Sequence, residues 1–364
     1  LIDNAKDLLL GGSRIDIAAL VIQKTIAMNL KEGGEAVYFL PLSLLLNDGA
    51  NQFFRKYTVN GICYSIDKII DFNDLGVFDV ATRYGVMHVM RDCKQSFPID
   101  YDRWEGGEWK PHFANPIFND TDPLSISEES ESSLMAEFEP ISVQKYAAPR
   151  QGLNTCGANE IFIFNHTEDK GRDQCLVFNK SMEALLPKKF LYPLITGKNF
   201  SEENPVPHKW VLFPHNNDGR PLEIGQIERE ASLKKYLDAN REVLENRKGT
   251  LINVWIKKGY WWALFGIGDY CFYPYKVVWE AYGKIAFRPR IFHGNWQVNQ
   301  SLQAFMPAKT FNEAESLLHK LSDKRVEGYL LSLKMEGTMN WAQPGKIKKL
   351  LCFVEEQNSL FAVS

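Results

Sequence analysis

The sequence has few of the patterns that mark metal, redox or membrane proteins. Its six cysteines form no CxxC or CxxxC pair, and its seven histidines form no HExxH or HxH pattern. These absences exclude zinc-ribbon and dithiol motifs and leave a metal site without support. No apolar run is long enough to span a membrane, and no basic-then-apolar leader opens the chain. We therefore expect a soluble, cytoplasmic protein with reduced thiols.

Motifs for nucleotide binding and for hydrolysis are also missing. The sequence contains no Walker A, GxGxxG or GxSxG pattern, and none of its 17 prolines stands next to another. What is present is the composition of a globular protein, with 45% apolar and 24% charged residues, which excludes wholesale disorder. A length of 364 residues suggests two domains, or one domain with a large appendage.

Charge is unevenly distributed, although the whole chain carries a formal net charge of only −3. Residues 98–140 hold 11 acidic and 2 basic side chains, whereas residues 141–364 have an excess of seven basic ones. The acidic part includes a Ser- and Glu-rich run at 120–139 without Lys or Arg, which predicts a solvated connector. The predicted division is a first domain at 1–97, an acidic connector at 98–145 and a second domain at 146–364.

The first domain is predicted to be α/β. Ser13 or Asp16 can cap a helix that runs to about Leu30, and residues 36–40 form a short apolar run ended by Pro41, as in a buried parallel strand. Another helix is expected at 48–57, with strands at 61–70 and 84–90. This order is that of the second half of a doubly wound sheet.

Carboxylates cluster around the end of the strand predicted at 61–70. Asp67, Asp71, Asp74 and Asp79 lie where an α/β fold places functional loops. A solvated loop accounts for them as well, and we favour that interpretation.

The second domain combines helices and strands with a concentration of aromatic residues. Strands are predicted at 161–164 and 175–178, and helices at 228–247 and 311–333. Between Trp255 and Phe292 there are 13 aromatic residues in 38, interleaved with Lys257, Lys258, Lys276, Lys284, Arg288 and Arg290. Such a mixture suits nucleic-acid recognition, because cations contact phosphates and aromatic rings stack on bases. From composition alone we favour a β-rich core with inward-facing rings and solvated lysines, and both interpretations stay open.

Several segments resemble, in consistent order, N6-adenine DNA methyltransferases of the TaqI-like type. Residues 14–17, 30–34 and Pro41 resemble the region after the catalytic motif, and residues 76–84 with the strand after them resemble the final hairpin of the catalytic domain. Segments that resemble the target-recognition domain are 193–200, 210–215, 240–247, 265–279, the late helix from Asn312, and 345–347. The resemblance implies the C-terminal half of a doubly wound, Rossmann-like methyltransferase sheet, followed by a mixed α+β target-recognition domain.

Members of this family transfer a methyl group from S-adenosylmethionine to adenine N6 in double-stranded DNA. They bind the cofactor with an FxGxG-type turn and hold the flipped adenine with an Asn/Asp-Pro-Pro-Tyr/Phe loop. Neither motif is present, and both would lie N-terminal to Leu1, which stands where a Met would begin a chain. The resemblance therefore implies a C-terminal fragment that is inactive alone and binds no S-adenosylmethionine by itself. Its partner would be the missing N-terminal catalytic half, in the same polypeptide or a separate subunit.

The resemblance also assigns site residues. Phe78 matches the Phe that stacks on the flipped adenine, with Phe72 as a nearby rival. Candidate DNA contacts are Lys198, Lys257, Lys258, Lys276, Arg288 and Arg290, with Trp261 and Trp262 as packing or stacking groups. We expect a part of a restriction–modification or related defence enzyme. The alternatives are a stand-alone DNA-specificity module that works with a separate catalytic chain, and a carbohydrate-binding β-rich module.

Overall fold

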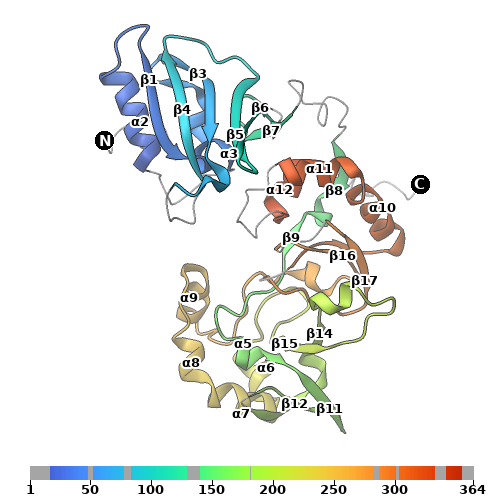
Figure 1. Cartoon of the computed structure of the whole chain (residues 1–364). Helices are drawn as coiled ribbons and strands as arrows, with labels where there is room; N and C mark the ends of the chain where they lie inside the picture. The colour runs from blue at the N-terminus through green and yellow to red at the C-terminus, as the bar shows by residue number, and fades with distance from the viewer. Residues whose placement is uncertain are drawn as a thin grey trace, which may run out of the picture. The chain divides into compact units, whose positions relative to one another are not determined.

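The structure is a computed structural model. It describes residues 17–47, 52–77, 83–117, 119–128, 140–180, 182–282, 287–300, 303–332 and 342–354. The chain divides into two compact units (Figure 1). The first unit comprises residues 1–139 and 327–341, and the second comprises 140–326 and 342–364. The first unit therefore extends well past the domain end predicted at residue 97.

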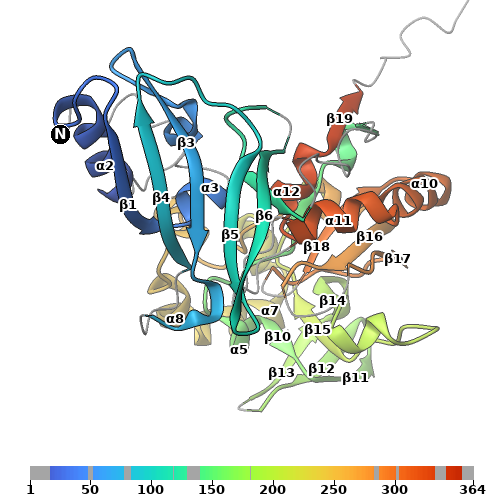
Figure 2. The ribbon, with the colours of Figure 1, turned by 45° about the horizontal axis from the view of Figure 1, so that its top comes forward.

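The first unit is built on one mixed sheet. Its strands are β1 (Glu35–Pro41), β2 (Thr58–Val59), β3 (Ile62–Asp71), β4 (Tyr84–Arg91), β5 (Ile99–Glu105), β6 (Glu108–Pro116) and β7 (Leu124–Ser127). The order is β1-β4-β3-β5-β6-β7, with β2 paired to β3. Strand β4 runs antiparallel to both β1 and β3, which are therefore parallel to each other, and β5 is parallel to β3 (Figure 2).

Helical segments contribute apolar side chains to the core on one face of this sheet. They are α2 (Ile17–Met28), α3 (Ser43–Leu46) and the 3-10 segment η1 (Gln52–Lys56), and a second 3-10 segment, η2 (Asn73–Leu75), follows β3. Alternate strand residues such as Leu40, Ile69 and Met87 point into the same core as Ile26 of α2. Period-two alternation in the strands thus provides one buried face.

Two predictions for this unit are wrong. The connector predicted at 98–145 is wrong for residues 99–127. This stretch forms β5, β6 and β7, which bury Ile99, Tyr101 and Leu124. The acidic residues between them, such as Asp100, take the outward positions of the strands. Strand β1 is also not a buried parallel strand. It lies at the edge of the described sheet, antiparallel to β4, and its Val37 and Phe39 are 65% and 53% exposed.

Other predictions for the first unit hold more closely. The strands expected at 61–70 and 84–90 are β3 and β4, and the first helix ends at Met28. Of the helix expected at 48–57, residues 52–56 form the 3-10 segment η1, and residues 48–51 lie outside the described residues. The proposed caps Ser13 and Asp16 lie outside the described residues.

The second unit contains several small sheets. One has the order β17-β16-β18-β9, the others β10-β15-β14, β11-β12-β13 and β19-β8. The strands are β8 (Ile141–Gln144), β9 (Arg150–Gln151), β10 (Ile163–Phe164), β11 (His166–Gly171), β12 (Gln174–Phe178), β13 (Glu183–Pro187), β14 (Leu191–Leu194), β15 (Lys209–Leu212), β16 (Tyr275–Glu280), β17 (Arg290–His293), β18 (Gln303–Ala308) and β19 (Leu351–Val354). All these pairings are antiparallel except that of β19 with β8.

Short helices connect these sheets. They are α5 (Asn159–Phe162), α6 (Ile224–Glu228), α7 (Ala231–Ala239), α8 (Arg241–Glu245), α9 (Thr250–Lys257), α10 (Phe311–Leu321), α11 (Lys324–Ser332) and α12 (Pro344–Lys349), with 3-10 segments η3 (Lys145–Ala147), η4 (Lys188–Phe190), η5 (Gly197–Phe200) and η6 (Asp269–Phe272). Helix α11 starts in the second unit and ends among residues assigned to the first. None of the helices in the described part of the chain is long and apolar enough to cross a membrane.

The helix predicted at 228–247 is interrupted, and the strand predicted at 161–164 begins as α5. Asn240, with φ −108° and ψ 8°, separates α7 from α8. The helices expected at 311–333 are α10 and α11, and α10 opens with a capping box between Thr310 and Glu313. Much of the aromatic stretch lies in the core. Trp262 Nε1 donates to the Leu222 carbonyl (3.1 Å) from a buried position.

Candidate functional site

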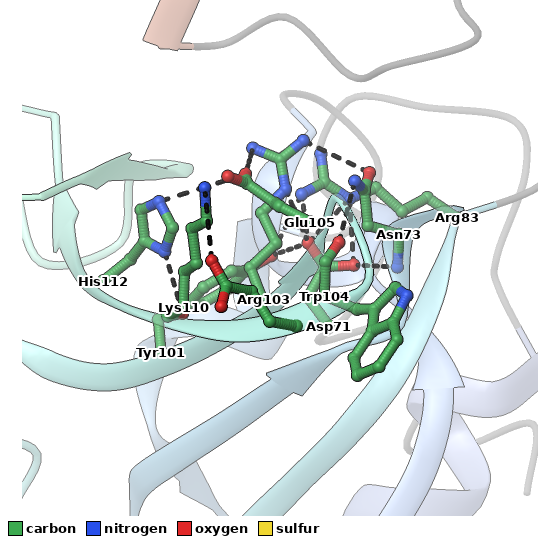
Figure 3. A network of polar contacts seen from close by, with 10 residues as sticks. Asp71, Asn73, Arg83, Tyr101, Arg103, Trp104, Glu105, Lys110 and His112 are labelled. Carbon is green, nitrogen blue, oxygen red and sulfur yellow. Dashed lines mark hydrogen bonds and ion pairs between the residues drawn. The ribbon is translucent and has the colours of Figure 1, made fainter. Parts of the chain in front are cut away.

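A buried carboxylate lies at the end of β3 in the first unit. Asp71 is fully buried, and Arg83, just before β4, forms an ion pair with it from a side chain that is 7% exposed. Arg83 Nε lies 3.1 and 2.9 Å from the two carboxylate oxygens, and the Tyr101 hydroxyl donates to Oδ2 at 2.6 Å. Figure 3 shows these side chains turned toward one another from β3, from the residue before β4 and from β5. We call Asp71, Arg83 and Tyr101 the Asp71 clamp.

A second layer of polar contacts surrounds the clamp. The Asn73 backbone N–H donates to Asp71 Oδ1 at 3.0 Å, and Arg103 Nε lies 3.7 Å from Oδ2. Arg103 also donates to Asn73 Oδ1 (3.2 Å) and pairs with Glu105 (3.0 Å), as Figure 3 shows. Each charge in this network therefore has an opposite charge or a dipole beside it.

The clamp can position groups, but it is not suited to acid–base chemistry. Burial raises the pKa of Tyr101 well above its usual value, so its hydroxyl keeps the proton that it donates to Asp71. The Asp71 carboxylate accepts from a guanidinium, a phenol and a backbone N–H, which occupy most of its acceptor capacity. The contacts join the end of β3 to the start of β4, and thereby the two ends of the segment 72–83.

Close backbone packing reinforces this junction. Gly85 lies opposite Asp71 in the sheet, and a β-carbon placed on it would overlap the Ile70 carbonyl oxygen. The Leu42 backbone N–H donates to the Arg83 carbonyl at 3.0 Å. A side chain at position 85 would therefore push β4 away from β3 and open the clamp.

The structure corrects the prediction that the carboxylates at 67–79 belong to a solvated loop. Asp71 is internal, whereas Asp67 is half-exposed and hydrogen-bonded to His88 Nδ1 (2.6 Å). Asp74 is exposed, and Asp79 lies outside the described residues. No three His, Cys, Asp or Glu side chains gather as a possible metal site in the described ranges.

The predicted base-stacking residue Phe78 lies outside the described residues. Its rival Phe72 belongs to a row of aromatic rings, with centroid distances of 6.1 Å to Phe39, 6.0 Å to Tyr84 and 6.1 Å to Trp109. Phe72 is therefore engaged in ring packing across the sheet.

Three of the predicted DNA contacts are buried in the second unit. Trp261 and Trp262, expected as packing or stacking groups, belong to its hydrophobic core, so they pack and their rings are not exposed for stacking. Lys276 is only 1% exposed and donates from Nζ to the Tyr273 carbonyl at 3.0 Å. Burial lowers the pKa of Lys276 to about 8. A lysine in this position cannot reach a phosphate without local unfolding.

The other candidates fall into two groups on the second unit. Lys257 and Lys258 are exposed at the end of α9, and Lys258 Nζ lies 5.5 Å from the centroid of the Trp255 ring. Lys198, in η5, and Arg288, just before β17, are also exposed. Arg290 is partly buried and donates to backbone carbonyls in η5 and just after it.

Sequence reasoning missed the partners of Asp71 and of Arg290. For Asp71 a signal was available, because Ile69 and Asp71 share the inward side of β3 in a period-two pattern. A carboxylate on the buried side of a strand requires a cation or donors, and Arg83 is the next cation after Lys68 along the sequence. No local signal links Arg290 to carbonyls about ninety residues earlier.

The fold of the chain is similar to that of part of a restriction–modification enzyme. One similar solved structure is that of the type IIL restriction-modification enzyme MmeI in complex with DNA, with a TM-score of 0.54 and 11% identity over 93% of this chain and 45% of the MmeI chain. The type IIG restriction endonuclease BpuSI aligns with a TM-score of 0.26 and 12% identity over 94% of this chain and 42% of its own. This chain thus spans less than half the length of either enzyme. No family model and no curated protein matches it.

Proposed function

We propose that the chain is the C-terminal part of an S-adenosylmethionine-dependent adenine-N6 DNA methyltransferase from a restriction–modification system. In this proposal the second unit recognises double-stranded DNA. The observation that carries the proposal is the likeness of fold to MmeI over 93% of the chain, because MmeI was solved in complex with DNA. The segments that resemble a target-recognition domain follow one another in the family's order, which also supports DNA recognition by the second unit.

The first unit supports a place in the catalytic domain. Strands β3 and β4 form a hairpin with β4 inserted antiparallel between β1 and β3, which suits the resemblance to the family's final hairpin. Apolar side chains on β1 and α2 are exposed, among them Phe39, Ile17 and Val21. An edge strand with exposed apolar residues favours further packing. We assign that packing to the N-terminal catalytic half, as part of the same polypeptide or as a separate subunit.

In this proposal the chain alone binds no S-adenosylmethionine. The FxGxG-type turn is missing from the sequence. The Asp71 carboxylate lies at the end of β3, where α/β folds bind ligands, and it already accepts from Arg83, Tyr101 and Asn73. We therefore assign cofactor binding and methyl transfer to the N-terminal half, and we derive no step of the reaction from this chain.

Within this proposal the Asp71 clamp holds the two ends of the segment that contains Phe78. Phe78 would stack on the flipped adenine, because an aromatic ring can offer its face to a base without reading its edge. Phe72 is less suited to this role since its ring packs against Phe39, Tyr84 and Trp109.

DNA contacts would come from the exposed cations of the second unit. Lys198, Lys257, Lys258 and Arg288 are accessible, and cations contact phosphates while fixing the orientation of the protein on the duplex. The carbohydrate alternative is less favoured, because Trp261, Trp262 and Trp279 of the aromatic stretch are buried. The stand-alone specificity module predicts the same DNA binding, and an upstream reading frame that continues without a stop codon would distinguish it from a fragment.

Binding to DNA is the first property to test. A gel-shift assay uses the 364-residue chain and random double-stranded DNA at two salt concentrations. We expect binding that weakens steeply with salt, because neutralised phosphates release counterions. No detectable binding at the lower salt concentration would overturn the proposal.

A further inference from the structure

The segment 196–208 of the second unit is a compact polar loop built around one buried amide. The Asn199 side chain is fully buried, and its Oδ1 accepts from the Thr196 backbone N–H at 2.8 Å. Its Nδ2 donates to Glu202 Oε2 (3.0 Å) and to the Val206 carbonyl (2.8 Å). Apart from the single 3-10 segment η5, the loop has no helix or paired strand, so its backbone depends on these few polar contacts.

Arg290 of β17 holds the same loop from the neighbouring sheet. Its Nη1 donates to the carbonyls of Asn199 (3.0 Å) and Phe200 (3.2 Å), and its Nη2 donates to the Glu203 carbonyl (2.7 Å). The guanidinium also lies 5.8 Å from the centroid of the Phe292 ring. Because Nη1 and Nη2 already donate to three carbonyls, the guanidinium is not available to bind a phosphate bidentately.

The loop presents an exposed cation beside a second one. Lys198 is exposed and has no carboxylate partner among the residues that the structure describes. A β-carbon on the adjacent Gly197 would lie 3.4 Å from Glu280 Oε1, and the charge of Arg288 acts on the same carboxyl. Lys198 lies on the loop, and Arg288 lies just before β17. Both segments approach Glu280.

We propose that Arg290 is a positioning residue, which fixes the segment 197–203 so that Lys198, together with Arg288, contacts backbone phosphates of bound DNA. This inference rests on the proposed function and assigns a role to the loop within it. The role differs from the direct DNA contact that composition predicted for Arg290. A lysine at position 290 would keep the charge, but its single ammonium nitrogen could not occupy both the Nη1 and the Nη2 positions from which the guanidinium reaches the three carbonyls.

The test measures the salt dependence of binding in the full chain. Fluorescence anisotropy of a labelled random duplex is recorded over a series of KCl concentrations for the unaltered chain and for Lys198→Gln, Arg290→Lys and the double variant. We expect Lys198→Gln to reduce the magnitude of the slope of log K against log salt by about 0.9, the value for one phosphate contact. Arg290→Lys should produce a similar loss, and the double variant should lose no more than either single variant.

Lys235→Gln on α7 is the matched control, since it removes one exposed charge elsewhere on the second unit. Hydrogen exchange of the segment 197–206 provides a second readout, and we expect faster exchange there in Arg290→Lys at an unchanged melting temperature. Wild-type affinity and slope in Arg290→Lys would overturn the inference. Equal effects of Lys198→Gln and Lys235→Gln, or faster exchange throughout the unit, would also overturn it. Absence of DNA binding by the unaltered chain would instead defeat the proposed function itself, and this inference with it.

Discussion

Replacing Asp71 by Asn tests whether the Asp71 clamp holds the end of the sheet together. The change removes the negative charge but leaves an oxygen that can accept from the Tyr101 hydroxyl. Arg83, with a side chain only 7% exposed, then keeps a buried charge without its main counterion. Removing one partner of a buried ion pair costs about 3–5 kcal/mol, and we expect the lower end of that range because Tyr101 keeps its acceptor. Asp71→Ala should cost about 1–3 kcal/mol more, since the buried hydroxyl then loses its acceptor as well.

The assay is urea unfolding followed by circular dichroism, with hydrogen exchange of β3 and β4 to report on the first unit separately. Asp67→Asn is the matched control, because this half-exposed carboxylate bonds His88 and its loss should cost about 0–1 kcal/mol. The double variant Asp71→Leu with Arg83→Met should recover much of the stability, since it removes both charges together. A loss for Asp71→Asn no larger than that for Asp67→Asn would refute the reasoning.

Three further predictions concern base stacking, pH and DNA contacts. In a reconstituted enzyme, Phe78→Ala should reduce methylation and base-flipping fluorescence more than Phe72→Ala does, and equal effects would contradict the assignment of Phe78. Burial lowers the pKa of His215 from its ordinary 6.5 to about 4. As the pH falls, this imidazole is therefore protonated in the unfolded chain before it is protonated in the folded one. The free energy of unfolding should therefore fall by about 3 kcal/mol as the pH drops from 6.5 to about 4. Urea titrations across this pH range measure the fall, and His215→Gln should abolish it. Replacing Lys257 and Lys258 by Gln should reduce the magnitude of the salt slope of DNA binding by about 1.8, and an unchanged slope would exclude α9 from the interface.

Strands and helices with a strong local pattern could be predicted from the sequence, whereas the pairing of the strands could not. The alternation within 61–70 and 84–90 is visible without any partner, and it identified β3 and β4 to within one residue at their ends. The apolar run at 36–40 also forms a strand. Its direction and exposure depend on β4, more than forty residues later, and a run of apolar residues contains no information about which strand will lie beside it.

The acidic connector was predicted wrongly because composition was averaged over a segment that alternates. Within β5, Ile99 and Tyr101 are buried while Asp100 is exposed and Asp102 is half-buried. Averaging the two faces of such a strand yields a polar mean, even though one face contributes to the core. The same effect hid Asp71, whose partners Arg83 and Tyr101 are 12 and 30 positions away.

The basic excess of the C-terminal region overstates the surface that is available to DNA. Arg247 is buried and donates to the carbonyls of Leu244 (3.0 Å), Thr155 (3.1 Å) and Trp261 (2.7 Å), much as Arg290 holds the loop after η5. Lys276 is also internal. A guanidinium that bonds backbone carbonyls stabilises the fold but releases no counterions from a bound duplex. The salt dependence of DNA binding should therefore follow the exposed cations, Lys198 among them, and be weaker than the formal charge of this region implies.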